Sequence, residues 1–201
     1  SPMAKFEAPE QFSMRISALA AQPNQNKELL NQGFKLAEER FENAILQNPL
    51  DFRLHLFLGR HYNYFYQFSG DKEKLLLAEK SLERALELGP TNQQVYFIFA
   101  QTRFLQGEQE KAIELLQKAK ELEPRFVWSG WYLARSYKMI GKYELALSEL
   151  KEVENLGFDW QQNVETLKEG IEILKKTGEA LELLIPLYEK GIELNPQDIY
   201  L

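Results

Sequence analysis

The sequence predicts an all-α protein in which helix–turn–helix units repeat and stack as a solenoid. Three observations predict this fold: a recurring proline, pairs of small residues at helical spacing, and single glycines between amphipathic runs. Pro90 and Pro124 each follow an amphipathic run and lie 34 residues apart, and a further 34 residues reach Phe158, where another helical run ends. A fixed period of this length indicates a repeat architecture.

The chain is expected to begin with an irregular segment, residues 1–26, whose first three residues resemble a cloning-tag remnant. Pro23 and Asn24 interrupt the helical pattern there. A half-unit follows at 27–51, with one long helix over Lys27–Gln47. A stripe of residues alternately four and three apart predicts that this helix faces a neighbouring helix. The stripe consists of Leu30, Phe34, Ala37, Phe41 and Ala44.

Four full units are predicted, at 52–92, 93–126, 127–160 and 161–198, before a truncated start of a further element at 199–201. In the first three units, two small or slim residues seven apart flank a large one on the second helix. Small residues let two helix axes approach closely, while the large side chain fills the space beside them. The triplets are Ala78, Leu82 and Ala85; Ala112, Leu116 and Ala119; and Ala146, Leu150 and Val153. Gly107 and Gly141 are expected at the turns between paired helices.

Two units depart from the 34-residue pattern, and each departure predicts a structural feature. The unit at 52–92 has seven extra residues, which amount to two helical turns, so both of its helices can lengthen. Aromatic residues between Tyr62 and Ala78 are then expected to pack on the longer helices or, alternatively, to form a docking patch. In the last unit, Pro186 is expected to kink or break the second helix, because proline removes a backbone hydrogen bond.

The composition argues against catalysis. With a net charge of -6, the chain has no general affinity for nucleic acid, and without cysteines it has neither a thiol nucleophile nor a cysteine-ligated zinc site. His55 and His61 lie six residues apart, which does not give a shared metal-binding face, and His55 is expected in the core. Glycines occur singly, so no phosphate-binding loop is present. We expect no enzyme activity, no cofactor, no metal and no direct membrane insertion, since apolar runs fall far short of the ~20 residues that span a bilayer.

Three segments share a large residue, a small one, two variable ones and, usually, an aromatic: residues 58–62, 99–103 and 133–137. Together with the turn glycine, the small–large–small triplet and the terminal proline, they resemble the tetratricopeptide repeat over about residues 27–198. The resemblance implies a right-handed superhelix forming a single domain, whose first helices line a concave groove that binds a partner segment. The clamp with which some members hold chaperone C-termini is absent, since its positions read Leu56, Arg60, Ile98, Trp128 and Tyr132.

The family's groove positions, transferred by register, give the predicted partner-binding residues. They are rich in the aromatic side chains and arginine that dominate binding hot spots. They are Arg53, Leu56, Arg60, Asn63, Tyr64, Gln94, Phe97, Gln101, Phe104, Trp128, Trp131, Arg135 and Lys138. In the last unit the same register gives Gln162, Glu165, Glu169 and Glu172, so the charge changes sign along the groove and favours a partner with acidic and basic ends. Trp131 has an alternative interpretation as a residue packed between repeats, because it stands beside Gly130, where the family's core tryptophan usually lies.

The leading hypothesis is a non-catalytic protein–protein interaction scaffold that binds a peptide or protein partner in the groove. One alternative is a self-association module, with a weak homodimer through the C-terminal unit if Leu184, Leu187 and Ile192 are left uncovered. The other is an auxiliary domain of a membrane glycan enzyme, because residues 48–53, 58–60 and 156–160 resemble C-terminal repeat regions of bacterial O-antigen ligase or polymerase-like proteins. The compartment, cytoplasmic or extracytoplasmic, stays open.

Overall fold

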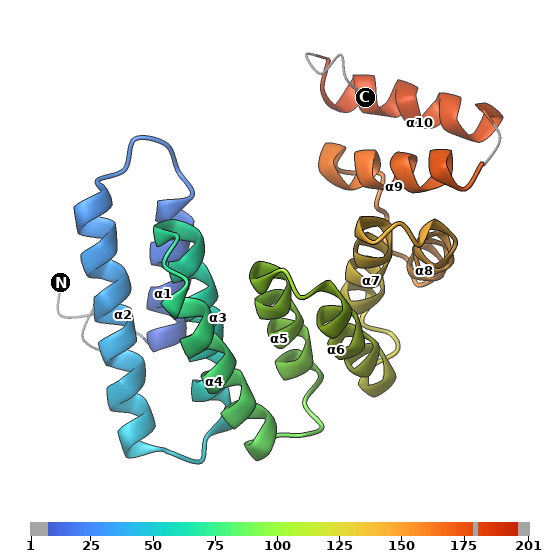
Figure 1. The fold of residues 1–201 in the computed structure, drawn as a ribbon. Helices are drawn as coiled ribbons and strands as arrows, with labels where there is room; N and C mark the ends of the chain where they lie inside the picture. The colour runs from blue at the N-terminus through green and yellow to red at the C-terminus, as the bar shows by residue number, and fades with distance from the viewer. Residues whose placement is uncertain (1–7, 179–180, 197–201) are drawn as a thin grey trace. The chain divides into compact units, whose positions relative to one another are not determined.

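The structure is a computed structural model that describes residues 8–178 and 181–196, and within these ranges its regular structure is entirely α-helical (Figure 1). The helices are α1 (Pro9–Ala20), α2 (Lys27–Gln47), α3 (Phe52–Ser69), α4 (Glu73–Leu88), α5 (Gln93–Gln106), α6 (Gln109–Leu122), α7 (Val127–Met139), α8 (Tyr143–Asn155), α9 (Val164–Lys176) and α10 (Leu181–Leu194). The predicted all-α repeat fold is confirmed, and each unit expected from residue 52 onward contains one pair of helices. The expected tag remnant and the expected element at 199–201 lie outside the described residues.

Polar side chains determine where several helices begin. Side-chain oxygens accept hydrogen bonds of 2.8 to 3.1 Å from N–H groups in the first turns of α2, α3, α5 and α9. These N–H groups have no partner within the helix, so the bonds stabilise each start. The capping residues are Asn26, Asp51, Asn92 and Asn163. After α5, Gly107 adopts a φ of 80°, a left-handed conformation that costs glycine nothing, and the predicted turn is confirmed.

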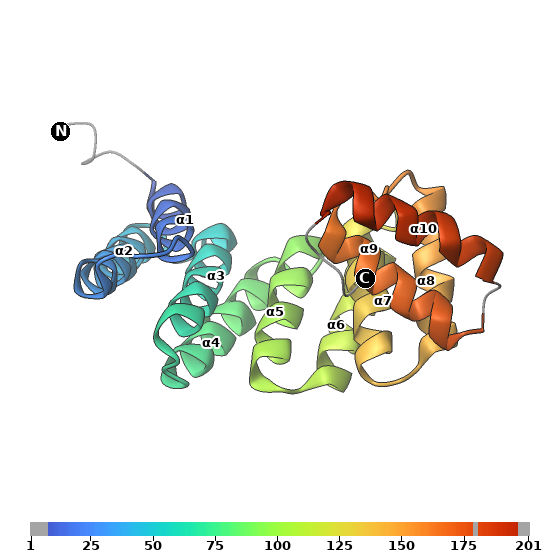
Figure 2. The same ribbon diagram turned by 90° about the horizontal axis from the view of Figure 1, so that it is seen from above.

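The chain divides into two compact units, residues 1–115 and 116–201, where we expected a single domain. In the first unit, α3 packs against α1, α2, α4 and α5 (Figure 2). In the second unit, α7 packs against α8, α8 contacts α9, and α9 pairs with α10. Each helix pair of a repeat protein contacts only its neighbours, so a repeat array has no common core that joins its ends.

Small residues allow paired helices to approach closely in both units. A Cβ atom added to Gly59 of α3 would lie 2.5 Å from Cγ of Leu82 on α4, closer than real side chains come. In the second unit, a Cβ atom on Gly130 of α7 would lie 2.5 Å from Cγ1 of Val153 on α8. The predicted stripe of α2 is buried as expected, except that Ala44 is half-buried.

The seven extra residues lengthen both helices of the first full unit, as predicted. α3 has 18 residues and α4 has 16, whereas α5 and α6 have 14 each. The additional turns carry aromatic side chains toward α2, where the rings of Phe65 and Phe68 stack on Phe34 at centroid distances of 4.9 and 5.1 Å. The structure therefore supports packing on the longer helices as the role of these two residues.

The N-terminal segment differs from the expectation, because α1 is a regular helix that packs against α2 and α3. Pro9 stands in its first turn, where the missing N–H group is not needed. Pro23 and Asn24 lie in the turn between α1 and α2. The 34-residue period predicted neither α1 nor this turn. Ser13 of α1 is buried, and its Oγ lies 2.9 Å from Nδ1 of His61 on α3.

The two histidines differ in burial, and the expectation that His55 lies in the core is wrong. His61 is fully buried among the rings of Phe34, Phe41 and Phe65, at centroid distances of 5.7 to 6.1 Å. Burial is the main cause that lowers the pKa of His61 to about 4, and the positive charge of Lys74 acts in the same direction. His55 was expected in the core but is only half-buried, because its Nε2 faces the carbonyl oxygen of Pro49 at 3.1 Å.

The last helix corrects two further expectations. α10 is continuous from Leu181 to Leu194 with Pro186 inside it, so the proline does not break the helix. Leu184 and Leu187 were expected to be uncovered, but both are buried. Ile192, expected to be uncovered as well, is 56% exposed.

Candidate interaction surface

The predicted partner-binding residues are divided between the two units. Those on α3 and α5 belong to the first unit, and those on α7 belong to the second. Arg53, Gln94 and Trp128 are exposed. A second group is half-buried, consisting of Arg60, Tyr64, Phe97, Gln101, Phe104, Arg135 and Lys138.

Three of the predicted contact residues are buried. Leu56 is 1% exposed and belongs to a hydrophobic cluster that links α3, α4 and α5. Asn63 is 3% exposed, and its Oδ1 accepts a hydrogen bond of 3.0 Å from the hydroxyl of Thr102 on α5. Trp131 is 2% exposed and packs against Phe158 at a ring-centroid distance of 5.3 Å, in agreement with its alternative interpretation as a packed residue.

Arg60 presents a cation on the first unit that the described residues do not neutralise with a carboxylate. Its guanidinium lies over the ring of Phe57, 4.7 Å from the centroid, and donates a hydrogen bond of 3.6 Å to Sδ of Met14 on α1. Met14 is 49% exposed and was not among the predicted residues, because the segment that carries it was expected to be irregular. The stacked ring and the sulfur hold the charge in place and leave most guanidinium N–H donors free for an acceptor.

Arg53, by contrast, is already paired within its own helix start. Its Nη2 lies 2.9 Å from Oδ2 of Asp51, and its Nε donates to Oδ1 of the same carboxylate at 3.0 Å. The side-chain hydrogen bond from Arg53 is the main reason that the pKa of Asp51 is lowered. The charge of Arg53 is therefore neutralised by Asp51, the N-terminal cap of α3.

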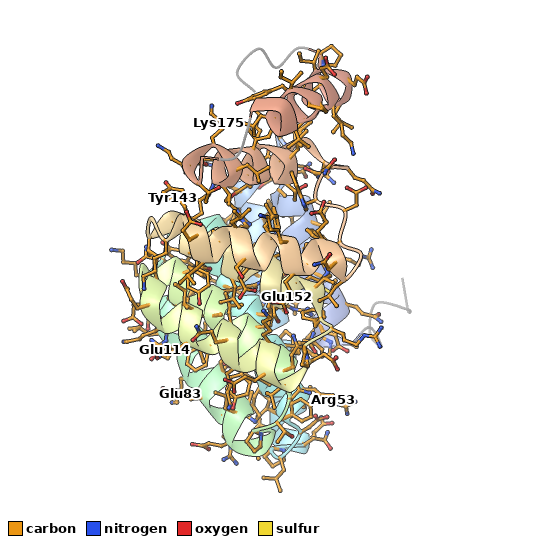
Figure 3. The ribbon with its side chains drawn as sticks, turned by 90° about the vertical axis from the view of Figure 1, so that its right-hand side faces the viewer. Arg53, Glu83, Glu114, Tyr143, Glu152 and Lys175 are labelled. Atoms are coloured by element: carbon orange, nitrogen blue, oxygen red, sulfur yellow. The ribbon has the colours of Figure 1, made fainter. Side chains whose placement is uncertain are left out.

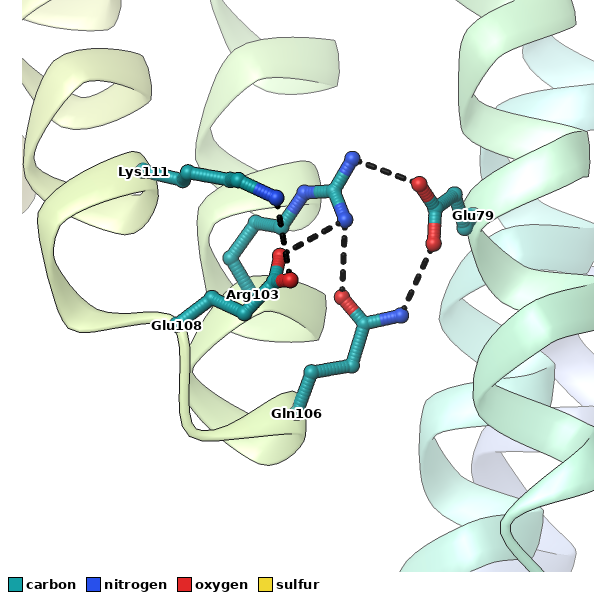
Figure 4. Close-up of polar contacts among 5 residues, drawn as sticks. All are labelled: Glu79, Arg103, Gln106, Glu108 and Lys111. Carbon is teal, nitrogen blue, oxygen red and sulfur yellow. Dashed lines mark hydrogen bonds and ion pairs between the residues drawn. The ribbon is translucent and has the colours of Figure 1, made fainter.

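Another arginine of the first unit links α5 to α4 and to the residue that precedes α6 (Figure 4). Arg103 of α5 bonds Glu79 of α4 at 2.6 Å and Glu108, just before α6, at 2.8 Å. Gln106 links the same groups by accepting from Arg103 and donating to Glu79. Lys111 also pairs with Glu108 at 3.0 Å, and this bond is the main cause that lowers the pKa of Glu108. The network fixes the turn between α5 and α6 against α4.

The cations predicted for the groove in the second unit are neutralised within that unit. Arg135 of α7 lies 3.0 Å from Glu169 of α9. Lys138 lies 2.6 Å from Glu169 and 2.8 Å from Glu172. The sequence predicted that the change from basic to acidic residues along the groove would favour a partner with acidic and basic ends. In the structure these basic and acidic residues instead pair with one another, between α7 and α9.

Charged side chains also cover the outer faces of the helices, as exposed Glu83 of α4 and Glu114 of α6 show (Figure 3). Within residues 8–178 and 181–196, no cluster of three or more histidine, aspartate or glutamate side chains could hold a metal ion. None of the helices in the described part of the chain has the length and hydropathy to cross a membrane.

Comparison with known proteins agrees with the all-α repeat fold. Residues 71–125 match the profile of the family described as tetratricopeptide repeat. The crystal structure of the protein MamA has a TM-score of 0.62 at 16% identity, covering 93% of each chain. A thermophilic TPR protein of Thermus thermophilus has a TM-score of 0.59 at 19% identity, covering 94% of this chain and 93% of that one. YrrB, described as a TPR protein with an unusual peptide-binding site, has a TM-score of 0.60 at 17% identity, covering 86% and 84%. No curated protein sequence matches the chain.

Paired helices with small residues at their close contacts define an all-α helical repeat protein. Residues 71–125 carry a match to the tetratricopeptide repeat, and the solved tetratricopeptide repeat proteins share the all-α repeat fold of the chain.

Proposed function

We propose that this chain is a non-catalytic interaction scaffold that binds a partner segment on the face formed by α1, α3 and α5 of the first unit. The observation that carries the proposal is Arg60, a guanidinium fixed by Phe57 and Met14 without a neutralising carboxylate among the described residues. Arginine beside an aromatic ring is typical of binding hot spots. Of the predicted set, the proposal retains the exposed and half-buried residues on α3 and α5, and it leaves out Leu56 and Asn63, which are buried.

A partner that fits this face supplies an acidic group for Arg60 and apolar groups for the half-buried rings of Tyr64, Phe97 and Phe104. The test is selection of random peptides displayed on phage against the whole chain. Peptides that bind here should lose about tenfold in affinity for Arg60→Gln, the usual size of a hot-spot effect. Arg125→Gln, which changes an exposed arginine of the second unit, is the matched control. Unchanged affinity for Arg60→Gln across all selected peptides would place binding elsewhere.

Self-association is a second candidate, supported by the exposed face of α10. Ile185 and Ile192 lie seven residues apart and are 54% and 56% exposed, so both present apolar side chains on one side of the helix. Exposed apolar surface favours association. A role as an auxiliary domain of a glycan-processing membrane enzyme stays a prediction.

A further inference from the structure

A groove opens on the first unit away from the α1–α3–α5 residues described above. Its floor is one face of α3, where His55, Leu58 and Tyr62 follow one another at helical spacing. α2 forms one wall through Glu42, Ile45 and Leu46, and α4 forms the other through Leu77, Lys80, Ser81 and Arg84. The groove has a volume of about 510 Å³.

The groove is an outward extension of the hydrophobic core. Leu58 and Tyr62 are buried members of the cluster around Phe41 and Ala78, and Ile45 and Leu77 pack on that cluster while half-buried. At the mouth, Leu46 is 79% exposed. The apolar floor continues into an exposed leucine. Covering this surface with a second apolar surface removes it from water and so lowers the free energy.

The two walls carry opposite charges. Lys80 and Arg84 stand four residues apart on α4, one helical turn, and both face the groove. Lys80 is exposed and has no ion pair among the described residues, and Arg84 pairs only with Glu87 in an exposed contact of 2.7 Å. Such surface pairs contribute little, so a better-placed carboxylate can replace Glu87. Glu42 supplies the single carboxylate of the opposite wall.

We propose that this groove binds an amphipathic helix of a partner protein, with carboxylates along the edge that faces α4. A helix offers apolar side chains at i, i+3 or i+4 and i+7 to a groove of this kind, and its flanking positions can supply the matching charges. The apolar row covers Leu58, Ile45 and Leu77, and acidic residues meet Lys80 and Arg84. The site is distinct from the face around Arg60, so one chain can hold two segments at once.

The probe is a phage library of displayed helices. In each helix the row of positions i, i+3 or i+4 and i+7 varies among leucine, isoleucine, phenylalanine and alanine. Positions flanking this row vary among glutamate, glutamine and lysine. Selection on wild-type protein should enrich helices with glutamate on one side of the row. Leu46→Lys should weaken their binding by about tenfold, because it places a charge over the apolar mouth. The matched control is Leu76→Lys, since Leu76 is a 65% exposed leucine of α4 that does not line the groove.

A second variant tests the charge assignment. Lys80→Glu should remove the preference for glutamate at the flanking positions, because the wall then carries one carboxylate beside Arg84, whereas Lys72→Glu, at an exposed lysine before α4, should leave the preference unchanged. Methyl NMR signals of Ile45, Leu58 and Leu77 should shift on addition of a selected helix. The proposal is overturned if no helix is enriched, if Leu46→Lys binds as well as wild type, or if a second copy of the chain is found to occupy the groove.

Discussion

Arg135 and Glu169 lie 34 residues apart in the sequence, one repeat period, and 3.0 Å apart in space, on α7 and α9. Lys138 and Glu172 repeat the same separation at 2.8 Å. Residues one period apart occupy equivalent positions on successive first helices, so opposite charges at this spacing meet across the helix contact. The second unit thereby neutralises cations that would otherwise attract an acidic partner.

We predict that Arg135→Glu lowers the free energy of unfolding of the second unit, because it places two carboxylates face to face. The loss should be about 1 kcal/mol or less, since Arg135 is partly exposed and water screens the contact. Combining Arg135→Glu with Glu169→Gln should restore part of the stability, because it removes the facing carboxylate while Lys138 keeps its pair with Glu172. Urea denaturation at low and high salt measures both effects, and a double variant no more stable than Arg135→Glu would contradict the pairing.

The two tryptophans of α7 should respond differently to truncation. Trp131→Ala should reduce the free energy of unfolding by about 3–5 kcal/mol, because the indole is buried and its removal leaves a cavity. Trp128→Ala should cost much less, since that side chain is 44% exposed and touches Phe158 only edge-on. Denaturation followed by circular dichroism measures both variants. Equal losses would show that Trp131 is not packed as described.

The sequence predicts helices and their pairing more securely than it predicts the exposure of single side chains. The α2 boundaries agree with the expected range Lys27–Gln47, because a continuous apolar stripe and the cap at Asn26 both mark them. Trp131 and Asn63 were placed on the surface, because successive residues of a helix point about 100° apart and a small error of register exchanges groove for core. Only the structure resolves that rotation.

A different limit applies to contacts between elements. The separation of Arg135 from Glu169 by one full period was visible in the sequence and could have predicted their pairing. The contact of Arg60 with Met14 had no such signal, because α1 does not follow the repeat register. The groove between α2 and α4 likewise depends on how two second helices lie beside α3, which residue spacing alone does not determine.

We predict that acidification destabilises the first unit through His61. Because its pKa falls from 6.5 to about 4 on folding, the unfolded chain binds a proton that the folded chain does not, over the window between these values. The stabilising contribution is fully present above pH 6.5 and is lost as the pH falls toward 4, by roughly 3 kcal/mol at most.

The readout for His61 is the difference in the free energy of unfolding between pH 7.5 and pH 4.5. His61→Gln retains a polar group near Ser13 but does not titrate, so its loss over this range should be smaller than that of wild type. His55→Gln is the control, because His55 is only half-buried. Identical pH dependence in wild type and His61→Gln would refute the assignment.

The C-terminal unit should mediate weak self-association through the exposed isoleucines of α10. Ile185 and Ile192 are both more than half exposed, and Leu194 nearby is 41% exposed. Ile192→Lys should therefore lower the apparent mass at high protein concentration, since a charge cannot be buried in an apolar contact without cost. Light scattering over a concentration series measures this effect, with Leu145→Lys, at a 47% exposed leucine of α8, as the control. A wild-type chain that stays monomeric throughout the series, or a dimer that Ile192→Lys leaves intact, would rule out this surface.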